Sequence, residues 1–299
     1  MKLLVIGANG QLGWALGEKR EKSGFNLERV DLPDFNITDK VNVSRQVEKS
    51  DPDLVINASA YTAVDKAESE SELAFAVNAK GPAYLAEACA SRGIPMIHVS
   101  TDYVFDGEKK TPYLESDPVS PLGVYGKSKA AGDDAIRNLL SSHVIIRTAW
   151  LYGTHGQNFV KTMLRLGKER KTLRVVADQH GCPTYAADLA DAILKISRHI
   201  LNGSHDQWGT YHYCGQGSTT WHGFAEEIFN IAGTLIPLKV RKTEPVSTDD
   251  YPTPTRRPAN SVLDCRRIKE KFGIRTRPWK ESLAEMLKIL LSGEGRLDV

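Results

Sequence analysis

The sequence has few cysteines, and none of them lie close together along the chain. Cys89, Cys182, Cys214 and Cys265 are the four cysteines in 299 residues, and no two of them form a CxxC pair. Zinc sites and the disulfide frameworks of small secreted proteins both depend on closely spaced cysteines. We therefore expect four reduced, mostly buried thiols and no bound metal.

Long hydrophobic runs are also absent. The N-terminus offers only Leu3–Ile6 before Gly7, which is far shorter than the roughly 7 to 15 apolar residues of a signal peptide. No later run approaches the ~20 apolar residues that cross a bilayer. We expect a cytoplasmic protein that does not interact with membranes.

Neither sign of charge is in excess. The chain has 39 Lys and Arg residues against 37 Asp and Glu residues, which gives a formal net charge of +2. Proteins that bind nucleic acid rely on a surplus of cations, so this composition gives no reason to expect a nucleic-acid partner. The hydrophobic fraction of 41% is ordinary for a globular protein with a sizeable core.

Short apolar segments alternate with stretches that are long enough to form a helix. The apolar segments are Leu3–Ile6, Leu54–Ile56, Met96–Val99 and Val144–Ile146, and Leu27–Val30 is predicted as the second strand along the chain. Strands that are apolar throughout, rather than at every second residue, are typical of parallel sheets with helices on both faces. The pattern predicts an α/β fold, specifically a Rossmann-type doubly wound parallel sheet.

The second half of the chain is richer in Gly, Pro and Thr and predicts a smaller α/β region that binds the substrate. Gly209–Cys214, between two helix-like stretches, is apolar enough to return to the main sheet. We therefore assign residues 1–150 and about 187–225 to a cofactor-binding domain. Residues of about 151–186 and 226–299 form the smaller region.

The first strand runs directly into the glycine-rich segment GANGQLG, residues 7–13. In dinucleotide-binding folds, glycines at such positions permit a tight turn, close approach to a pyrophosphate and close packing of the next helix. The N-terminus of that helix then faces the phosphates. The segment therefore predicts an NADPH or NADH site, made by Gly7, Asn9, Gly10, Gln11, Leu12 and Gly13.

Two aspartates after the second predicted strand are candidates for the adenosine end of the cofactor. Asp31 follows Val30, where a carboxylate can accept hydrogen bonds from the ribose. It could instead begin a loop, and the nearby Arg29 could bind a 2′-phosphate, so the choice between NADH and NADPH stays open. Asp39 could contact adenine or could cap the following helix.

The spacing of Tyr125 and Lys129 is that of a YxxxK motif. On a helix, this spacing puts the phenol and the ammonium one turn apart on the same face. A nearby cation lowers the pKa of a phenol, so we expect Tyr125 to act as a proton donor. Thr101 follows the strand in VSTDYVF, and its hydroxyl is predicted to bond the substrate oxygen at the carboxyl edge of the sheet.

Six segments carry a family resemblance: GANGQLG, INASAYTAVDKAE, VNAKGPAYLAEACA, VSTDYVFDG, YGKSKAAGD and RTAWLYG. Together they resemble the extended short-chain dehydrogenase/reductase superfamily and, within it, the dTDP-4-dehydrorhamnose reductase family. The resemblance covers nearly the whole chain. It implies the NADPH- or NADH-dependent reduction of the 4-keto group of a dTDP-sugar, dTDP-4-dehydro-L-rhamnose, to dTDP-L-rhamnose.

The resemblance also implies roles for individual residues. Thr101, Tyr125 and Lys129 match the catalytic triad, and Lys129 also matches the ligand of the nicotinamide ribose. Further matches to cofactor contacts are Asn57, Ala58, Ala60, Tyr61 and Asn78. Matches to substrate contacts are Thr101, Asp102, Trp150, Asn158 and either Arg256 or Arg257, although the two arginines could also be ordinary solvated surface residues.

The chain departs from the family in one place, and other functions are open. Some members bind magnesium at a homodimer interface through a glutamate after the GxPT segment, but here that segment continues to Asp188 without a glutamate. A homodimer is compatible with the resemblance, whereas a metal-bridged one is not expected. Alternative functions are a nucleotide-sugar epimerase or dehydratase, or a non-catalytic subunit like the regulatory subunit of methionine adenosyltransferase. Dehydratases place Asp-Glu after the threonine, whereas this chain has Asp102 and Tyr103.

Overall fold

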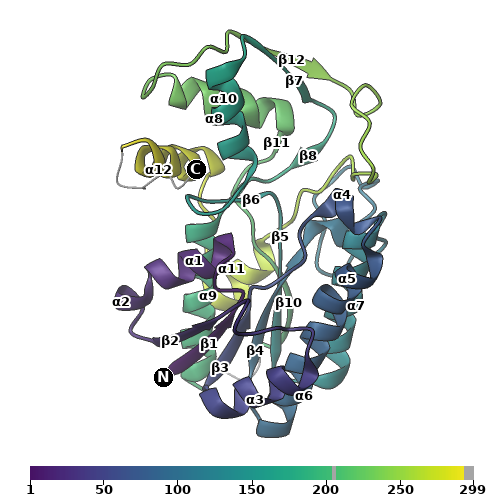
Figure 1. Cartoon of the computed structure of the whole chain (residues 1–299), viewed down its shortest axis with the longest axis vertical. Coiled ribbons are helices and arrows are strands. Elements are labelled where there is room, and N and C mark those ends of the chain that lie inside the picture. Colours follow the sequence, from purple (N-terminus) through teal and green to yellow (C-terminus); the bar gives the residue numbers. More distant parts are fainter. Residues whose placement is uncertain (204–206, 293–299) are drawn as a thin grey trace.

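The computed structural model describes residues 1–203 and 207–292. Its largest element is a sheet of parallel strands in the order β10-β5-β4-β3-β1-β2 (Figure 1). This confirms the predicted Rossmann-type α/β fold. The strands are β1 (Lys2–Ile6), β2 (Asn26–Val30), β3 (Leu54–Asn57), β4 (Met96–Thr101), β5 (His143–Thr148) and β10 (Gly209–His212). The segment that begins at Gly209 returns to the sheet as predicted, because β10 pairs in parallel with β5.

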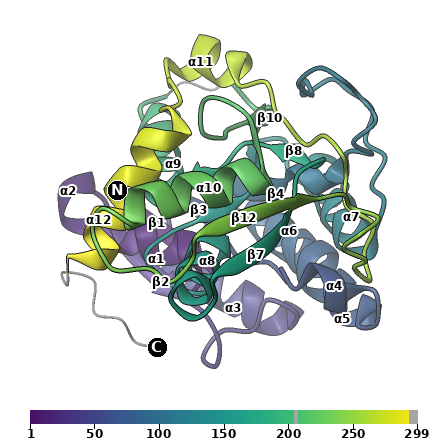
Figure 2. The ribbon, with the colours of Figure 1, turned by 90° about the horizontal axis from the view of Figure 1, so that it is seen from above.

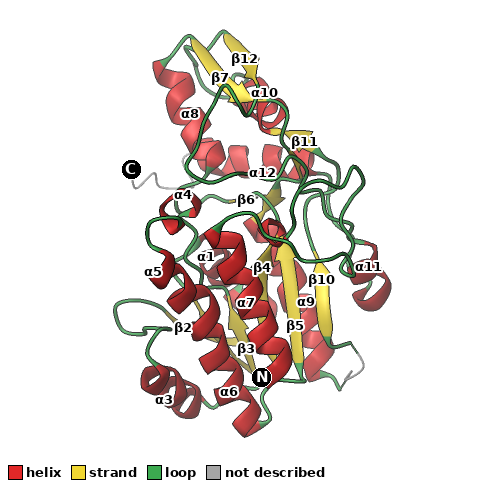
Figure 3. Ribbon diagram, turned by 90° about the vertical axis from the view of Figure 1, so that its right-hand side faces the viewer, coloured by secondary structure: helices red, strands yellow, loops and turns green. Residues whose placement is uncertain are grey.

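Helices cover both faces of this sheet, as the apolar strands predicted. Leu3 and Val5 of β1 pack into one core cluster, and Leu4 and Ile6 pack into another. This alternation is the two-residue period of a strand that is buried on both sides. The two helix layers (Figure 3) are α1 (Gln11–Glu18), α9 (Ala186–Leu201) and α11 (Arg266–Phe272) on one face, and α3 (Lys40–Ser50), α6 (Gly81–Arg92) and α7 (Val124–Leu139) on the other.

Short helices lie in the connections between the main strands. They are α2 (Arg20–Ser23), α4 (Val64–Ala67), α5 (Ser71–Phe75), the π-helical turn η1 (Ala76–Lys80) and the 3₁₀ turn η2 (Asp102–Val104). Of these, η2 follows β4 directly, so the backbone turns sharply at Thr101.

A smaller region lies over the carboxyl ends of the sheet and has its own core (Figures 1 and 2). Its elements are α8 (Phe159–Glu169), β7 (Thr172–Val176), α10 (Trp221–Ala232), β12 (Lys242–Val246) and α12 (Trp279–Leu291). The strands β7 and β12 pair in parallel. Two further short pairs are β6 (Leu151–Tyr152) with β9 (Thr184–Tyr185), and β8 (His180–Gly181) with β11 (Thr219–Thr220).

The packing corrects the predicted division of the chain at two elements. Ile268 and Phe272 of α11 pack in the core of the main sheet, although residues 226–299 were predicted for the smaller region. Phe224 of α10 packs in the smaller core, although 187–225 were predicted for the cofactor-binding part. Residues 204–206 and 293–299 of these predicted ranges lie outside the described residues.

The sheet has a topological switch point between β1 and β3. From β1 the chain first adds β2 on one side and then β3 on the other. In open α/β sheets, ligands bind in the crevice that this reversal opens at the carboxyl ends of the strands. Among the helices of the described residues, we find none with the length and apolar character needed to cross a bilayer.

Candidate active site

A cleft of about 900 Å³ lies at the carboxyl ends of the main strands, and residues of the smaller region form part of its wall. It brings together most of the predicted site residues. Those that line it are Gly7, Asn9, Gly10, Gln11, Leu12, Asp31, Ala58, Ala60, Tyr61, Thr101, Asp102, Tyr125, Lys129, Trp150, Asn158 and Arg257. The other predicted residues, which are Gly13, Asp39, Asn57, Asn78 and Arg256, are not in the lining.

The glycine-rich loop is shaped by close backbone packing. Gly7 has a φ of +84°, in the region that favours glycine. A Cβ on Gly7 would lie 2.6 Å from the backbone nitrogen of Ser59, and one on Gly13 would lie 2.0 Å from the carbonyl oxygen of Gly7. Gly13 therefore supports the loop from beneath. The loop leaves the first turn of α1 facing the cleft, where its free N–H groups can bind phosphate.

Asp31 lies at the end of β2 and lines the cleft. Its carboxylate accepts hydrogen bonds from the backbone nitrogens of Asn9 and Leu32, each at 2.8 Å. Arg29, the alternative considered for a 2′-phosphate, points elsewhere: its guanidinium lies against Gly17 of α1, and it is not among the lining residues. Of these two residues, only Asp31 lines the cleft.

Asp39 is the N-cap of α3. Its carboxylate accepts hydrogen bonds from the backbone nitrogens of Val41 and Asn42 at 2.9 and 3.1 Å. Asp39 does not line the cleft, so of the two alternatives the structure favours the helix cap over a contact with adenine. In sequence, an aspartate that caps a helix looks the same as one that contacts adenine. Only the observed position of the helix distinguishes the two roles.

Two buried asparagines support the loop after β3 rather than lining the cleft. The Asn57 side-chain oxygen accepts hydrogen bonds from the backbone nitrogen and hydroxyl of Ser59 at 3.1 and 2.7 Å. Asn78 accepts from the backbone nitrogen of Tyr61 at 2.8 Å and donates to its carbonyl oxygen at 3.0 Å. Asn78 also donates to the Ser128 hydroxyl at 3.0 Å, which ties the loop to α7.

Thr101 and Tyr125 meet in the cleft. Thr101 ends β4, and Tyr125 is in the first turn of α7. The Thr101 hydroxyl donates to Asp102 Oδ1 at 3.0 Å, and burial raises the pKa of Asp102 to about 6. Burial also raises the pKa of Tyr125 above its ordinary value, although a hydrogen bond with Thr101 opposes this effect. The phenol therefore carries its proton at neutral pH.

Lys129 is buried one turn beyond Tyr125. Its Nζ donates to the carbonyl oxygen of Val99 at 2.7 Å and lies 3.2 Å from Nε2 of His98. Burial lowers the pKa of Lys129 to about 8, and the charge of Asp133 opposes this shift. We expected Lys129 to lower the pKa of Tyr125. The structure differs, because the Lys129 ammonium donates its hydrogen bond to the Val99 carbonyl oxygen, and burial has the largest effect on the pKa of Tyr125.

Trp150 is held between two neighbours. It has a φ of +46°, and its ring stacks on that of Trp221 with centroids 3.5 Å apart. A Cβ on Gly181 would lie 2.3 Å from the Trp150 ring, so only glycine fits there. Trp221 also lines the cleft. Sequence reasoning missed Trp221 because it stands at the start of a predicted helix, where nothing in the local pattern marks a site residue.

The smaller region contributes Asn158 and Arg257. Asn158 caps α8 and donates to the Gln11 side-chain oxygen at 3.0 Å, which joins the glycine-rich loop to the smaller region. Arg257 Nη2 pairs with Asp65 at 3.0 Å, and its buried Nε has no hydrogen-bond partner within the described ranges. Arg256 is exposed and is not among the lining residues. The structure thus distinguishes between two arginines that the sequence alone could not tell apart.

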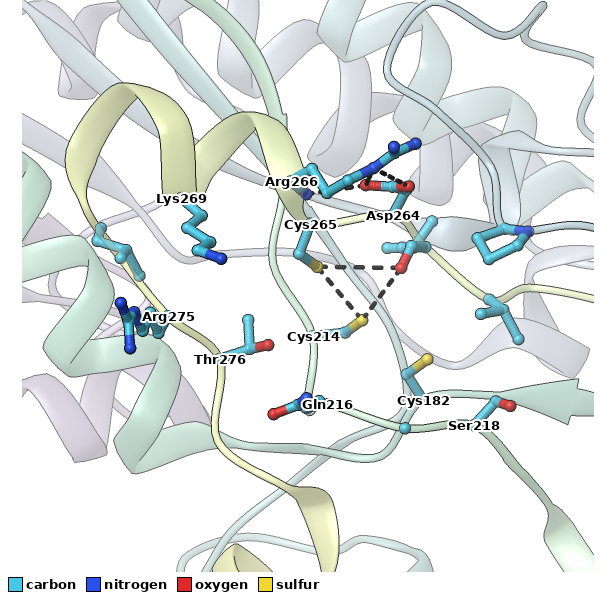
Figure 4. A pocket seen from close by; sticks show the side chains of 16 residues that line it. Cys182, Cys214, Gln216, Ser218, Asp264, Cys265, Arg266, Lys269, Arg275 and Thr276 are labelled. Atoms are coloured by element: carbon cyan, nitrogen blue, oxygen red, sulfur yellow. Dashed lines mark hydrogen bonds and ion pairs between the residues drawn. The ribbon is translucent and has the colours of Figure 1, made fainter.

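A second cavity of about 710 Å³ lies apart from these residues (Figure 4). Three of the four cysteines line it, and Sγ of Cys214 lies 3.6 Å from Sγ of Cys265 with Cys182 nearby. All four cysteines are free. Their wide spacing in the sequence concealed this cluster, because the fold brings β10, the loop before β9 and the start of α11 together.

Comparison with known proteins identifies the family. The family model of the RmlD substrate binding domain matches residues 1–292. A dTDP-4-dehydrorhamnose reductase of Sinorhizobium fredii is 43% identical over 292 residues, which cover 97% of this chain and 98% of the relative. The chain belongs to the dTDP-4-dehydrorhamnose reductase family.

Solved structures of this family share the whole fold. The crystal structure of a dTDP-4-dehydrorhamnose reductase from Clostridium acetobutylicum matches with a TM-score of 0.90 and 42% identity, and the match covers 97% of this chain and 99% of that one. A dTDP-4-dehydrorhamnose reductase from Bacillus anthracis, solved in complex with NADP, matches with a TM-score of 0.88 and 37% identity over 95% and 98% of the two chains.

Asp188, the residue considered for the family's magnesium site, has other partners here. Its carboxylate pairs with Nη1 of Arg277 at 2.9 Å and accepts a hydrogen bond from Ser282. We find no cluster of metal-binding side chains in the part of the chain that the structure describes.

Proposed function

We propose that this protein reduces the 4-keto group of dTDP-4-dehydro-L-rhamnose to dTDP-L-rhamnose with NADPH or NADH. Membership of the dTDP-4-dehydrorhamnose reductase family supports the reaction. The observation that carries the residue assignment is the meeting of Thr101 and Tyr125, with Lys129 one turn further, in the same cleft as the glycine-rich loop.

The cleft fits a dinucleotide. A cradle of backbone surrounds Gly7, where any Cβ would collide with the loop after β3, and the N-terminus of α1 offers free N–H groups to a pyrophosphate. Gly7, Asn9, Gly10, Gln11 and Leu12 would hold the phosphates, with Asp31 at the adenosine ribose. Ala58, Ala60 and Tyr61 would contact the cofactor from the loop after β3. When bound, the reduced nicotinamide supplies the hydride for C4 of the sugar.

The chain itself supplies the proton. As the carbonyl carbon accepts the hydride, its oxygen gains negative charge and needs a proton donor. The Tyr125 phenol donates that proton, and its high pKa ensures that the proton is present at neutral pH. The Thr101 hydroxyl hydrogen-bonds the same oxygen. Lys129 binds the nicotinamide ribose and returns a proton to the Tyr125 oxygen.

The smaller region would bind the rest of the substrate. Trp150, stacked on Trp221, gives the sugar a flat apolar wall, and Asp102 beside Thr101 can bond a sugar hydroxyl. Arg257 would bind the diphosphate, because a guanidinium offers paired donors to phosphate oxygens. Asn158 stabilises the wall through its bond to Gln11.

A turnover assay tests this function. The protein is incubated with dTDP-4-keto-6-deoxy sugars and either cofactor, and the loss of absorbance of the reduced nicotinamide is followed. Tyr125→Phe should lower turnover by roughly 10² to 10⁴, the usual contribution of a general acid, with nearly unchanged cofactor binding. Tyr84→Phe, a tyrosine of α6 outside the cleft, is the matched control. Activity of Tyr125→Phe within a few-fold of the wild type would disprove its role.

We further propose a cytoplasmic homodimer that needs no magnesium. The free cysteines support a reducing compartment. The engagement of Asp188 by Arg277 and Ser282 within the chain supports independence from magnesium.

A further inference from the structure

A buried polar chain lies behind Lys129, on the side away from the cleft. His98 of β4 is fully buried, and its Nε2 is 3.2 Å from Lys129 Nζ. The same Nε2 is 3.9 Å from Oδ1 of Asp133. Tyr125, Lys129 and Asp133 follow one another at four-residue intervals on α7, so they share one face of the helix. The proposed proton transfer from Tyr125 does not itself involve His98 or Asp133.

The hydrogen bonds of Asn57 determine which nitrogen of His98 carries the hydrogen. The Asn57 oxygen already accepts two hydrogen bonds from Ser59, so its amide nitrogen faces His98 Nδ1, at 3.1 Å. An amide nitrogen only donates, and Nδ1 must therefore accept. Burial holds the pKa of His98 well below its usual range, so the ring is neutral. Its single N–H is consequently at Nε2, directed at Lys129 and Asp133.

This arrangement responds to the charge of Lys129. A charged ammonium has no lone pair, so it cannot accept from the Nε2–H of His98. When Lys129 is neutral, its nitrogen can accept that hydrogen bond. When Lys129 is charged, Nε2–H is left to the electrostatic attraction of Asp133 Oδ1, which lies 3.9 Å away and has no hydrogen-bond partner among the described residues. His98 therefore favours the neutral lysine, whereas the negative charge of Asp133 favours the charged one.

We propose that His98 and Asp133 are positioning residues that set the balance between charged and neutral Lys129 in opposite directions. The proposal deepens the proposed function, since it rests on Lys129 returning a proton to Tyr125. In that step the proton leaves Lys129 Nζ for the Tyr125 oxygen. Lys129 becomes neutral at that moment, and the Nε2–H of His98 then supplies the hydrogen bond that the neutral amine can accept.

The other charged groups around α7 act elsewhere. Burial raises the pKa of Asp133 above its ordinary value, and the charges of Arg147 of β5, Lys129 and Arg137 of α7, with the hydrogen bond from Ser100, oppose that rise. The charge of His143 of β5 contributes to lowering the pKa of His98. Three more groups lie at the start of the helix: Asp102 and Tyr103 of η2 raise the pKa of Tyr125, and Glu68 accepts a hydrogen bond from the first backbone nitrogen of α7.

The sign of each expected effect follows from these contacts. Replacing His98 by leucine removes a donor that opposes the ammonium, so the pKa of Lys129 should rise. Asp133→Asn removes a charge that favours the ammonium, so the pKa should fall. If turnover needs charged Lys129, the rate declines as the pH rises through this pKa, which is about 8 in the wild type. The decline should move to higher pH in His98→Leu and to lower pH in Asp133→Asn.

The decisive experiment measures the ionisation of Lys129 without substrate. Protein labelled with carbon-13 lysine is titrated by NMR, and the signal of Lys129 is assigned by its absence in Lys129→Met. We expect the acid dissociation constant to change at least roughly threefold, downward in His98→Leu and upward in Asp133→Asn. His180→Gln, an exposed histidine of β8 outside the cleft lining, is the control and should leave the constant unchanged.

The outcomes separate this proposal from the proposed function. An unchanged or lowered pKa in His98→Leu overturns the proposal, and His98→Met serves the same purpose if the leucine variant does not fold. Shifts in the same direction for His98→Leu and Asp133→Asn overturn it as well. If the NMR shifts occur as expected but the decline in rate does not follow them, the proposal stands and the proposed catalytic role of Lys129 fails.

Discussion

In the proposed cofactor site, Asp31 is the residue through which the cleft would distinguish the two cofactors. Among the described residues that line the cleft, the cations are Lys129 and Arg257, and neither follows β2. A 2′-phosphate would therefore meet the carboxylate of Asp31 without a balancing cation nearby. Like charges repel, so Asp31 would disfavour the 2′-phosphate of NADPH, whereas it could accept a hydrogen bond from the 2′-hydroxyl of NADH.

We predict that Asp31→Ala shifts the preference of the enzyme toward NADPH. The ratio of kcat/KM for NADPH to that for NADH should rise about tenfold, because the variant loses a ribose acceptor and a repulsive charge together. Steady-state kinetics with both cofactors measure it. Asp34→Ala, a nearby aspartate outside the cleft lining, is the control. An unchanged ratio would place the adenosine ribose away from Asp31.

Arg257 and Arg256 form a natural matched pair, because they are adjacent in sequence and only Arg257 lines the cleft. A contact to the diphosphate is made equally before and during the reaction, so its loss raises KM more than it lowers kcat. Losing a charge-assisted hydrogen bond costs about 1.5 to 3 kcal/mol, so KM for the sugar nucleotide should rise roughly tenfold to a hundredfold in Arg257→Ala. Arg256→Ala should behave as the wild type. Equal effects in both variants would contradict the assignment.

Among the elements, α7 has the least freedom to change its position, because it presents Tyr125 and Lys129 to the cleft and also packs on η1. Gly132 is at that contact, and a Cβ there would lie 2.1 Å from the carbonyl oxygen of Asn78. Asn78 in turn holds the backbone of Tyr61. A side chain at position 132 would therefore push η1 and the loop after β3 away from the catalytic helix.

We predict that Gly132→Ala destabilises the protein by about 1 to 3 kcal/mol, the usual cost of overpacking. Alanine inside a helix normally stabilises by about 1 kcal/mol relative to glycine. Gly17→Ala in α1 is the matched control, because a Cβ there meets only the guanidinium end of the exposed Arg29 side chain, which can move aside. Urea unfolding of both variants tests this, and the prediction is wrong if Gly132→Ala is as stable as Gly17→Ala.

The elements differ in how far the sequence alone could predict them. The main strands and the glycine-rich loop were predictable because apolar runs and turn residues are local signals. The place of α11 against the main sheet was not, because an amphipathic helix does not reveal which core it joins. The same limit applies to Trp221 and to His98 behind Lys129, whose roles depend on neighbours more than thirty positions away in the chain.

At the scale of the whole molecule, the prediction concerns metal dependence. The carboxylate of Asp188 is engaged by Arg277 and Ser282 within the chain. We therefore predict that EDTA leaves both activity and oligomeric state unchanged. Turnover and light scattering after size-exclusion chromatography, each with and without EDTA, measure this. A large loss that magnesium restores would show a metal site built from other residues.

The position of β10 in the sheet has a consequence for synthesis of the protein. β10 covers the edge of β5, yet β5 ends at Thr148 and β10 begins only at Gly209. A ribosome adds about 5 to 20 residues per second, so this interval takes roughly 3 to 12 seconds. During that time the backbone of β5 is an open apolar edge, of the kind that pairs with other chains. The growing chain is therefore most prone to aggregate before residue 212 has emerged.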